Sequence, residues 1–193
     1  MSGFTFHRTE IEGIVIIEHD IHLDHRGSFI ETYRADVFQN AGLPDVFLQD
    51  NQSVSKKGTL RGLHFQLKRP QGKLVRAAYG TVFDVAVDIR PGSPTFGQWY
   101  GCVLSGENSR QLYVPPGFAH GFLVLTDGAV VQYKCTAYYE PDDQWGIRWD
   151  DPDIAIDWPL GDIERLIISR RDESLKRLSE IRESLDSAGL ADF

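Results

Sequence analysis

Cysteine is scarce in this chain of 193 residues, which contains two, Cys102 and Cys135. Two cysteines are too few for a disulfide framework, and neither belongs to a Cys-x-x-Cys pair or to the Cys/His spacing of a structural metal site. We therefore interpret both side chains as buried free thiols. The sequence excludes a small domain held together by disulfides.

Positive charge and long apolar runs are also in short supply. The chain has 20 Lys and Arg against 28 Asp and Glu, a formal net charge of −8. Affinity for nucleic acid depends on neutralising phosphates with basic residues, so this balance argues against general nucleic-acid binding. An anionic ligand would need a local cluster of positive charge. No apolar run approaches the roughly 20 residues of a membrane helix, so no membrane span is expected.

The first residues, MSGFTFHRTEIEG, lack both the basic and the apolar segment of a secretory signal, and we therefore expect a cytoplasmic protein. A composition of 41% apolar and 25% charged residues is typical of a globular domain. With about 150 residues per domain as a guide, the length predicts a single domain.

Residues 59–90, TLRGLHFQLKRPQGKLVRAAYGTVFDVAVDIR, carry a strong strand pattern. In residues 82–89 every second position is apolar, and the positions between include Asp84 and Asp88. Successive side chains of a strand point to opposite faces, so one face suits a core and the other carries carboxylates. Gly72 and Gly80 mark corners, where a residue without Cβ turns at little steric cost. Short strands joined by glycine corners predict a barrel or sandwich.

Shorter patterns predict further strands at residues 13–18, 29–33, 47–53, 99–104, 110–114 and 129–139. In the last of these, Tyr133 points away from Lys134. A short helix is predicted over 36–41, and a single amphipathic helix from Asp172, with Ser169 or Asp172 as its N-cap. Residues 140–159, rich in Asp, Trp and Pro, predict a loop that folds over the barrel.

Residues 115–125, PPGFAHGFLVL, form the most specific single motif. A Pro-x-Gly turn followed by His120 and an apolar strand resembles the second signature of the cupin barrel. Metal-binding cupins have His-x-His and then a glutamate in their first signature, whereas this chain has His64-Phe65-Gln66 and no glutamate in residues 67–72. His64 and His120 alone make a poor divalent site, so we expect no metal and no other cofactor. A metal-dependent cupin oxygenase or isomerase is correspondingly disfavoured.

Six motifs together point to one family. They are RGLHFQ (61–66), QGKLVR (71–76), FDVAVDIR (83–90), SPTFGQW (93–99), PPGFAHGF (115–122) and IRWDDPDIAIDWP (147–159). Over residues 13–172 the chain resembles the dTDP-4-dehydrorhamnose 3,5-epimerases, which are non-metal cupins. The resemblance implies a mainly β fold, a cupin-type double-stranded β-helix (jelly-roll) barrel with short C-terminal helices. It implies one domain over residues 1–193, with the barrel core at about 13–160 and a C-terminal helical segment at about 161–193.

The resemblance implies an isomerase acting on a dTDP-4-keto-6-deoxyhexose in dTDP-L-rhamnose biosynthesis. C3 and C5 of this sugar both lie α to the C4 ketone, and each is inverted by removing a proton and returning it on the opposite face. His64 matches the family's base, Lys73 the cation beside the developing C4 oxyanion, and Tyr133 the acid. Asp172 matches the carboxylate that orients His64, with Asp84 as the second candidate for that partner.

The family's nucleotide-binding positions fall on a further set of residues. Arg26 and Arg61 have guanidinium groups suited to a diphosphate, and Tyr139 is placed to stack on thymine. At Gln144 the family commonly has an acidic residue, so one base or sugar contact is left open there. The implied substrate-binding set is Arg26, Phe29, Glu31, Gln49, Asn51, Arg61, Lys73, His120, Tyr139 and Arg171.

Two alternatives stay open from the sequence. Related enzymes on the same scaffold invert C3 alone in deoxysugar pathways, and a non-catalytic nucleotide-sugar-binding cupin would share the binding residues. The resemblance also implies a homodimer. In it, an N-terminal strand is lent to the neighbour's sheet and supplies nucleotide contacts across the interface.

Overall fold

A computed structural model describes residues 3–190 of the chain. The strands are β1 (Phe4–Arg8), β2 (Val15–His19), β3 (His22–Asp24), β4 (Gly27–Phe29), β5 (Gln49–Lys56), β6 (Leu60–Gln66), β7 (Lys73–Tyr79), β8 (Thr81–Asp88), β9 (Trp99–Ser105), β10 (Gln111–Val114), β11 (Phe118–Val124), β12 (Gly128–Cys135) and β13 (Gln144–Gly146). The helices are α1 (Ala35–Asn40), α2 (Arg170–Glu173) and α3 (Leu178–Ser187), with one 3-10 turn at Pro141–Asp143.

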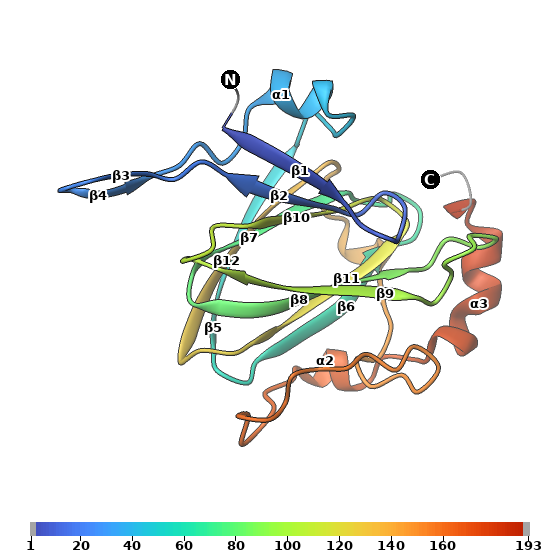
Figure 1. Cartoon of the computed structure of the whole chain (residues 1–193). Helices are drawn as coiled ribbons and strands as arrows, with labels where there is room; N and C mark the ends of the chain where they lie inside the picture. The colour runs from blue at the N-terminus through green and yellow to red at the C-terminus, as the bar shows by residue number, and fades with distance from the viewer. Residues whose placement is uncertain (1–2, 191–193) are drawn as a thin grey trace.

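Two antiparallel sheets pack against each other and form a barrel (Figure 1). The larger sheet has the strand order β1-β2-β10-β7-β12-β5, and the smaller has the order β13-β6-β11-β8-β9. Neighbours such as β6 and β11, or β7 and β12, are far apart in the sequence and pair antiparallel. This crossing-over of antiparallel strands is the arrangement of a jelly roll. The predicted mainly β, cupin-type barrel is confirmed.

Strand β8 shows how the two faces of the smaller sheet are covered. Val82 and Ala86 belong to a buried cluster that fills the barrel together with residues of β7, β10 and β11. Val85 and Val87 belong to a second buried cluster on the opposite face. The alternation predicted for residues 82–89 is therefore confirmed. Asp84, which shares the inward face, is fully buried, so its carboxylate needs a partner inside the protein.

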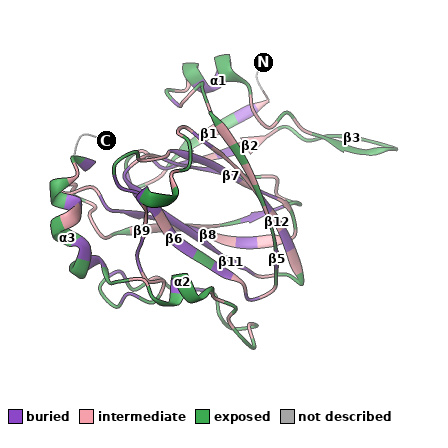
Figure 2. Ribbon diagram, turned by 180° about the vertical axis from the view of Figure 1, so that it is seen from behind, coloured by how far each residue is buried: buried purple, intermediate pink, exposed green. Residues whose placement is uncertain are grey.

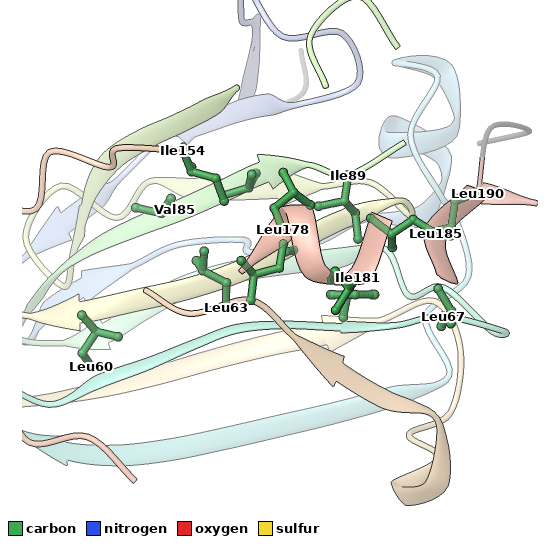
Figure 3. Close-up of a cluster of buried hydrophobic side chains, with 14 of the residues drawn as sticks. Leu60, Leu63, Leu67, Val85, Ile89, Ile154, Leu178, Ile181, Leu185 and Leu190 are labelled. Atoms are coloured by element: carbon green, nitrogen blue, oxygen red, sulfur yellow. The ribbon is translucent and has the colours of Figure 1, made fainter. Parts of the chain in front are cut away.

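Helix α3 covers the outer face of the smaller sheet. Figure 3 shows its Leu178, Ile181 and Leu185 gathered with Leu63 and Ile89 from the sheet side. Burying side chains of this size contributes roughly 1.5–3 kcal/mol each, so the C-terminal segment is part of the core. Within residues 3–190, no helix is long and apolar enough to cross a bilayer.

The single amphipathic helix predicted from Asp172 is instead two helices. Ser169 caps α2 by accepting a hydrogen bond from the backbone N–H of Asp172 at 3.1 Å, and α2 ends at Glu173. The chain then forms a parallel bridge between Lys176 and Ile147, and the carbonyl of Lys176 accepts from the backbone N–H of Arg148 at 3.0 Å. A helix cannot continue through residues paired in this way, so α3 begins afresh at Leu178.

The hairpin of β3 and β4 projects away from the barrel (Figure 1), and Figure 2 shows it as an exposed arm. Leu23 is 78% exposed and Phe29 is 69% exposed. The strand predicted for residues 29–33 ends at Phe29, so only its first residue is in a strand. Strand β1, by contrast, pairs with β2 of its own chain and extends the larger sheet. Helix α1 packs on the outer face of that sheet through Val37 and Phe38.

Both cysteines are free, as predicted. Cys135 is buried, but Cys102 is only partly buried, so the prediction of two buried thiols is correct for the first alone. Burial raises the pKa of the Cys102 thiol to about 12, so it is protonated at neutral pH.

Candidate active site

Polar side chains from several inward-facing strand positions line one cavity in the barrel. Its volume is about 430 Å³, and a second pocket of about 300 Å³ shares His64, Lys73, Tyr133 and Gln144 with it. On β7, inward Lys73 is followed at alternate positions by Val75 and Ala77, which are buried in the core. Because alternate residues of a strand face the same side, β7 presents the amine of Lys73 to the cavity and the apolar side chains of Val75 and Ala77 to the hydrophobic core.

Two glycines bring β6 and β11 close together beneath this cavity. A Cβ added to Gly62 would lie 2.6 Å from the Cα of Gly121, and Gly62 has a φ of +110° that few other residues adopt. Each of the motifs RGLHFQ and PPGFAHGF contributes one of these glycines. The close approach coincides with an irregularity in the pairing of β6 and β11, next to the position where His64 lies directly opposite His120.

His64 is hydrogen-bonded to Asp172. Its Nε2 lies 2.7 Å from Oδ1 of Asp172, which comes from α2 and is buried, while the His64 side chain remains 27% exposed. Burial raises the pKa of Asp172, but hydrogen bonding and the charge of His64, with the backbone N–H of Gly62, outweigh burial and lower it. The carboxylate is thus ionised at neutral pH and accepts a hydrogen bond from Nε2 of His64. In the neutral form of the imidazole ring this arrangement leaves the lone pair on Nδ1.

His120 has a carboxylate of its own. Its Nε2 lies 2.9 Å and 3.1 Å from the two carboxylate oxygens of Asp84, on the neighbouring strand β8. Both side chains are buried, with His120 7% exposed. Asp84 is therefore the hydrogen-bond partner of His120. Of the two candidates for the partner of His64, Asp172 is the one that lies within hydrogen-bond distance.

Lys73 is buried in the cavity wall. Its amine donates to the carbonyl of His64 at 3.3 Å, and among residues 3–190 it forms no ion pair. Burial lowers the pKa of Lys73, while the charges of Cys135 and Asp84 act in the opposite direction. A buried ammonium group that lacks a counter-ion is strongly stabilised when a negative charge develops beside it.

Tyr133 lines both pockets and comes from β12. Burial raises its pKa, the charge of Cys135 adds to this effect, and the charge of Arg61 opposes it. The phenol is therefore protonated at neutral pH and is available as a proton donor. As predicted, it lies on the opposite face from Lys134, whose amine pairs with Asp50 at 2.9 Å.

Most of the predicted nucleotide-binding residues lie around the same two pockets. Arg61, His120 and Arg171 line the larger one. Gln49, Asn51 and Tyr139 line the smaller one. Gln49 organises this group, because its side chain donates to Asn51 Oδ1 at 2.9 Å and accepts from the backbone N–H of Tyr139 at 2.8 Å.

Three predicted residues are not brought to this cavity within one chain. Arg26 and Phe29 belong to the projecting hairpin, and Glu31 follows it. Arg26 is largely exposed and forms an ion pair with Asp24 at 2.6 Å. The single chain thus leaves these residues outside the pockets that hold His64 and Tyr133.

Ser53 is a cavity residue that the sequence prediction did not single out. It lines the larger pocket, and its buried hydroxyl has no hydrogen-bond partner among residues 3–190. A buried hydroxyl without a partner is costly unless a ligand or water satisfies it. The signal in the sequence was the polar run that ends the predicted strand 47–53, which by itself did not distinguish Ser53 from its neighbours.

The charge balance of the cavity is opposite to that of the chain. Lys73, Arg61 and Arg171 contribute positive charge, and the only carboxylate in the lining of the larger pocket, Asp172, is already bound to His64. None of the three cations forms an ion pair within the described residues. This is the local positive cluster that an anionic ligand of an acidic protein requires.

No group of three or more His, Cys, Asp and Glu residues within residues 3–190 is arranged to hold a metal ion. His64 and His120, the two histidines of the cavity, direct their Nε2 atoms at separate carboxylates. The donor set of the metal-binding cupins is therefore not assembled by these residues.

Comparison with known proteins gives a consistent result. The dTDP-4-dehydrorhamnose 3,5-epimerase family model matches residues 8–180. A dTDP-4-dehydrorhamnose 3,5-epimerase from Methanothermobacter thermautotrophicus is 53% identical over 180 residues, which are 93% of this chain and 97% of the relative. One from Escherichia coli is 52% identical over 176 residues, 90% of this chain and 94% of the relative.

A solved structure is similar over nearly the whole chain. It is a dTDP-6-deoxy-D-glucose-3,5-epimerase from Legionella pneumophila in complex with dTDP-4-keto-L-rhamnose. The TM-score is 0.91 and the identity is 51%, with 94% of this chain and 96% of that chain covered.

Proposed function

The chain belongs to the dTDP-4-dehydrorhamnose 3,5-epimerase family, and we propose that His64, Asp172, Lys73 and Tyr133 perform the proton transfers of its reaction. The enzyme is an isomerase that converts dTDP-4-dehydro-6-deoxy-D-glucose to dTDP-4-dehydro-L-rhamnose in dTDP-L-rhamnose biosynthesis. The observation that carries this proposal is the His64–Asp172 pair in a cavity whose walls also contain Lys73 and Tyr133.

Proton removal is the step we assign to His64. Its Nδ1 lone pair takes the proton from C3 or C5, and the electron pair of the broken C–H bond forms an enolate with the negative charge on the C4 oxygen. The imidazolium that results is stabilised by the ionised carboxylate of Asp172 at 2.7 Å. A positioned general base contributes typically about 10²–10⁴-fold to such a step.

Stabilisation of the enolate is the role of Lys73. Its buried amine has no carboxylate partner among residues 3–190, so the C4 oxyanion becomes its counter-ion in the transition state. A fixed donor aimed at a developing oxyanion in a water-excluded site is worth about 2.7–4 kcal/mol. Lys73 therefore binds the transition state more strongly than the neutral ketone.

Proton return is the role of Tyr133. Its phenol donates a proton to the enolate carbon on the face opposite His64, and the C4 ketone forms again. The side chain of Tyr133 becomes a phenolate, which the positive charge of Arg61 favours. Exchange with solvent then restores the proton on Tyr133 and removes the one on His64, so atoms and charge balance over the cycle.

The nucleotide is held, in this proposal, by the residues around the rest of the two pockets. Arg61 and Arg171 are available to the diphosphate, because neither forms an ion pair within residues 3–190. Tyr139, which is 43% exposed, presents a ring face on which thymine can stack.

A second copy of the chain completes the site in this proposal. The resemblance implied that the lent segment is an N-terminal strand, but β1 pairs with β2 of its own chain, so we propose the hairpin of β3 and β4 as that segment. The hairpin of β3 and β4, which projects as an exposed arm in Figure 2, carries Arg26 and Phe29 away from its own cavity. The apolar side chains of Leu23 and Phe29 on this arm are exposed. Docked on a neighbour, the arm buries Leu23 and Phe29 and brings the guanidinium group of Arg26, which is paired with Asp24 in the single chain, to the neighbour's nucleotide pocket. We further propose that this homodimer acts in the cytoplasm.

Proton NMR of dTDP-4-keto-6-deoxyglucose in D₂O, with and without EDTA, tests the function. We expect deuterium to enter C3 and C5 in both conditions, with an L-configured 4-keto sugar as product. Exchange at C3 alone would instead make the protein a monoepimerase. Binding of the nucleotide sugar without exchange at either carbon would make it a binding protein.

A further inference from the structure

Gln144 lies between the two pockets and lines both of them. It is the first residue of β13, the edge strand of the smaller sheet, and pairs with Gln66 of β6. The preceding residue, Asp143, is buried, and its carboxylate accepts from the backbone N–H groups of Lys68 at 3.0 Å and Arg69 at 2.9 Å. The backbone at position 144 is thus fixed from both sides.

The side chain of Gln144 joins one residue of each pocket. Its Oε1 accepts from the hydroxyl of Tyr139 at 2.5 Å and from Nη1 of Arg171 at 3.0 Å, while Nη2 of Arg171 donates to its backbone carbonyl at 3.4 Å. A guanidinium group only donates, so the atom that faces it must be the amide oxygen. Tyr139 is then held at both ends, because Gln49 binds its backbone N–H.

Charge distinguishes this amide from a carboxylate of the same shape. Glutamate at position 144 would accept the same two hydrogen bonds but would pair with Arg171 and neutralise it. With glutamine, Arg171 forms no ion pair within residues 3–190 and retains its charge for a ligand. The amide therefore supplies geometry without competing for the cation.

We propose that Gln144 is a positioning residue for the nucleotide sugar: it holds Tyr139 and Arg171 at the junction of the two pockets and leaves the charge of Arg171 to the substrate's diphosphate. The identity of the ligand rests on the proposed function above. This role concerns binding and orientation. Within residues 3–190, the side chain of Gln144 forms no hydrogen bond with His64 or Asp172.

Gln144→Glu and Gln144→Met separate the two parts of this role. In Gln144→Glu we expect dTDP to bind the full-length protein roughly tenfold more weakly at low salt, the size of one charge-assisted hydrogen bond. KM should rise by a similar factor, while kcat should stay within about twofold of the wild-type value. The difference in dTDP affinity between the variant and the wild type should shrink at higher salt, because salt screens charge. In Gln144→Met both acceptor bonds are lost, so binding weakens without that added salt dependence.

Gln98→Glu is the matched control, because it adds the same charge at an exposed loop residue that lines neither pocket. Isothermal titration with dTDP, at two salt concentrations, gives the decisive comparison. Equal dTDP affinity in Gln144→Glu and Gln98→Glu at low salt would overturn the proposal, as would a loss of kcat with unchanged KM in both Gln144 variants. Since dTDP binding is measured without turnover, this result stands apart from any failure of epimerase activity in the wild-type protein.

Discussion

The two histidine–aspartate pairs of the cavity have the same chemistry in different surroundings. His64 and His120 lie opposite each other on neighbouring strands, and each binds a carboxylate at 2.7–2.9 Å. His64 is 27% exposed toward the cavity, whereas His120 is 7% exposed and Asp84 is fully buried. We propose that this difference leaves His64 accessible to a substrate with which it exchanges protons, whereas His120 is fixed in the wall of the cavity.

The partners of the two histidines differ in origin as well. Asp84 lies on β8, directly beside β11 in the same sheet. Asp172 lies on α2, which is 108 residues away from His64 in sequence. The first pair is therefore built into the barrel, and the second depends on how the C-terminal segment docks.

Among the variants outside the two histidines, Tyr133→Phe gives the largest effect we predict, and it sharpens the role of the exposed pair. Without the phenol, the proton cannot be returned from the second face, and we expect formation of the inverted product to fall by roughly 10²–10⁴-fold. Deuterium exchange from D₂O should persist, because His64 still removes the proton. NMR of exchange together with chiral analysis of the product separates the two; equal loss of both would remove Tyr133 from the acid role.

Lys73→Met tests the cation beside the exposed pair. Its amine contacts the carbonyl of His64, and methionine keeps the length of the side chain but removes the charge. We expect exchange and inversion to fall together by roughly 10²–10³-fold, since the enolate is common to both. Steady-state kinetics and NMR on the same sample measure this. A variant that lost inversion while exchanging at the wild-type rate would contradict the assignment.

Asp172→Asn and Asp84→Asn break the two pairs in the same way. Loss of one charge-assisted hydrogen bond to the base predicts a fall of roughly 10–100-fold in turnover for Asp172→Asn. For Asp84→Asn we expect turnover within a few-fold of wild type but a loss of about 3 kcal/mol in the free energy of unfolding, because the pair is fully buried. Kinetics and urea unfolding of both variants check this. The reverse pattern would exchange the roles of the two pairs.

The smallest effect we predict is on the free energy of unfolding at low pH. Since the pKa of Asp172 is lowered in the folded protein, its contribution to stability is present above the unfolded pKa of about 3.9 and is lost as the pH falls through the folded pKa. We therefore expect Asp172→Asn to lose less stability than wild type as the pH is lowered below about 4. Urea unfolding at pH 6, 4 and 3 measures the difference; parallel curves would contradict it.

Alternation, which is a local pattern, predicted the strands and a barrel or sandwich, and the resemblance to the epimerase family narrowed this to a cupin-type barrel. Residues 82–89 alternate strictly, and both faces proved to be buried as separate clusters. Alternation also explains why Lys73 faces inward at the start of β7. The position of each strand in its sheet was not needed for these predictions.

The choice of partner for His64 depended on long-range geometry that alternation does not contain. Both Asp84 and Asp172 were compatible with the sequence, and only the docking of α2 against β6 decided between them. The break between α2 and α3 has a similar cause, because it arises from pairing of Lys176 with Ile147. The projection of Arg26 on an arm was likewise invisible in the residue pattern.

Deuterium exchange at C3 and C5 in His64→Asn and His120→Asn tests the central claim most directly. Both substitutions keep a polar side chain of similar reach, so they compare the two histidines as bases. The account predicts that His64→Asn abolishes exchange at both carbons with little change in dTDP affinity, while His120→Asn still exchanges. Exchange at the wild-type rate in His64→Asn, or its abolition in a folded His120→Asn alone, would show that the exposed pair is not the base.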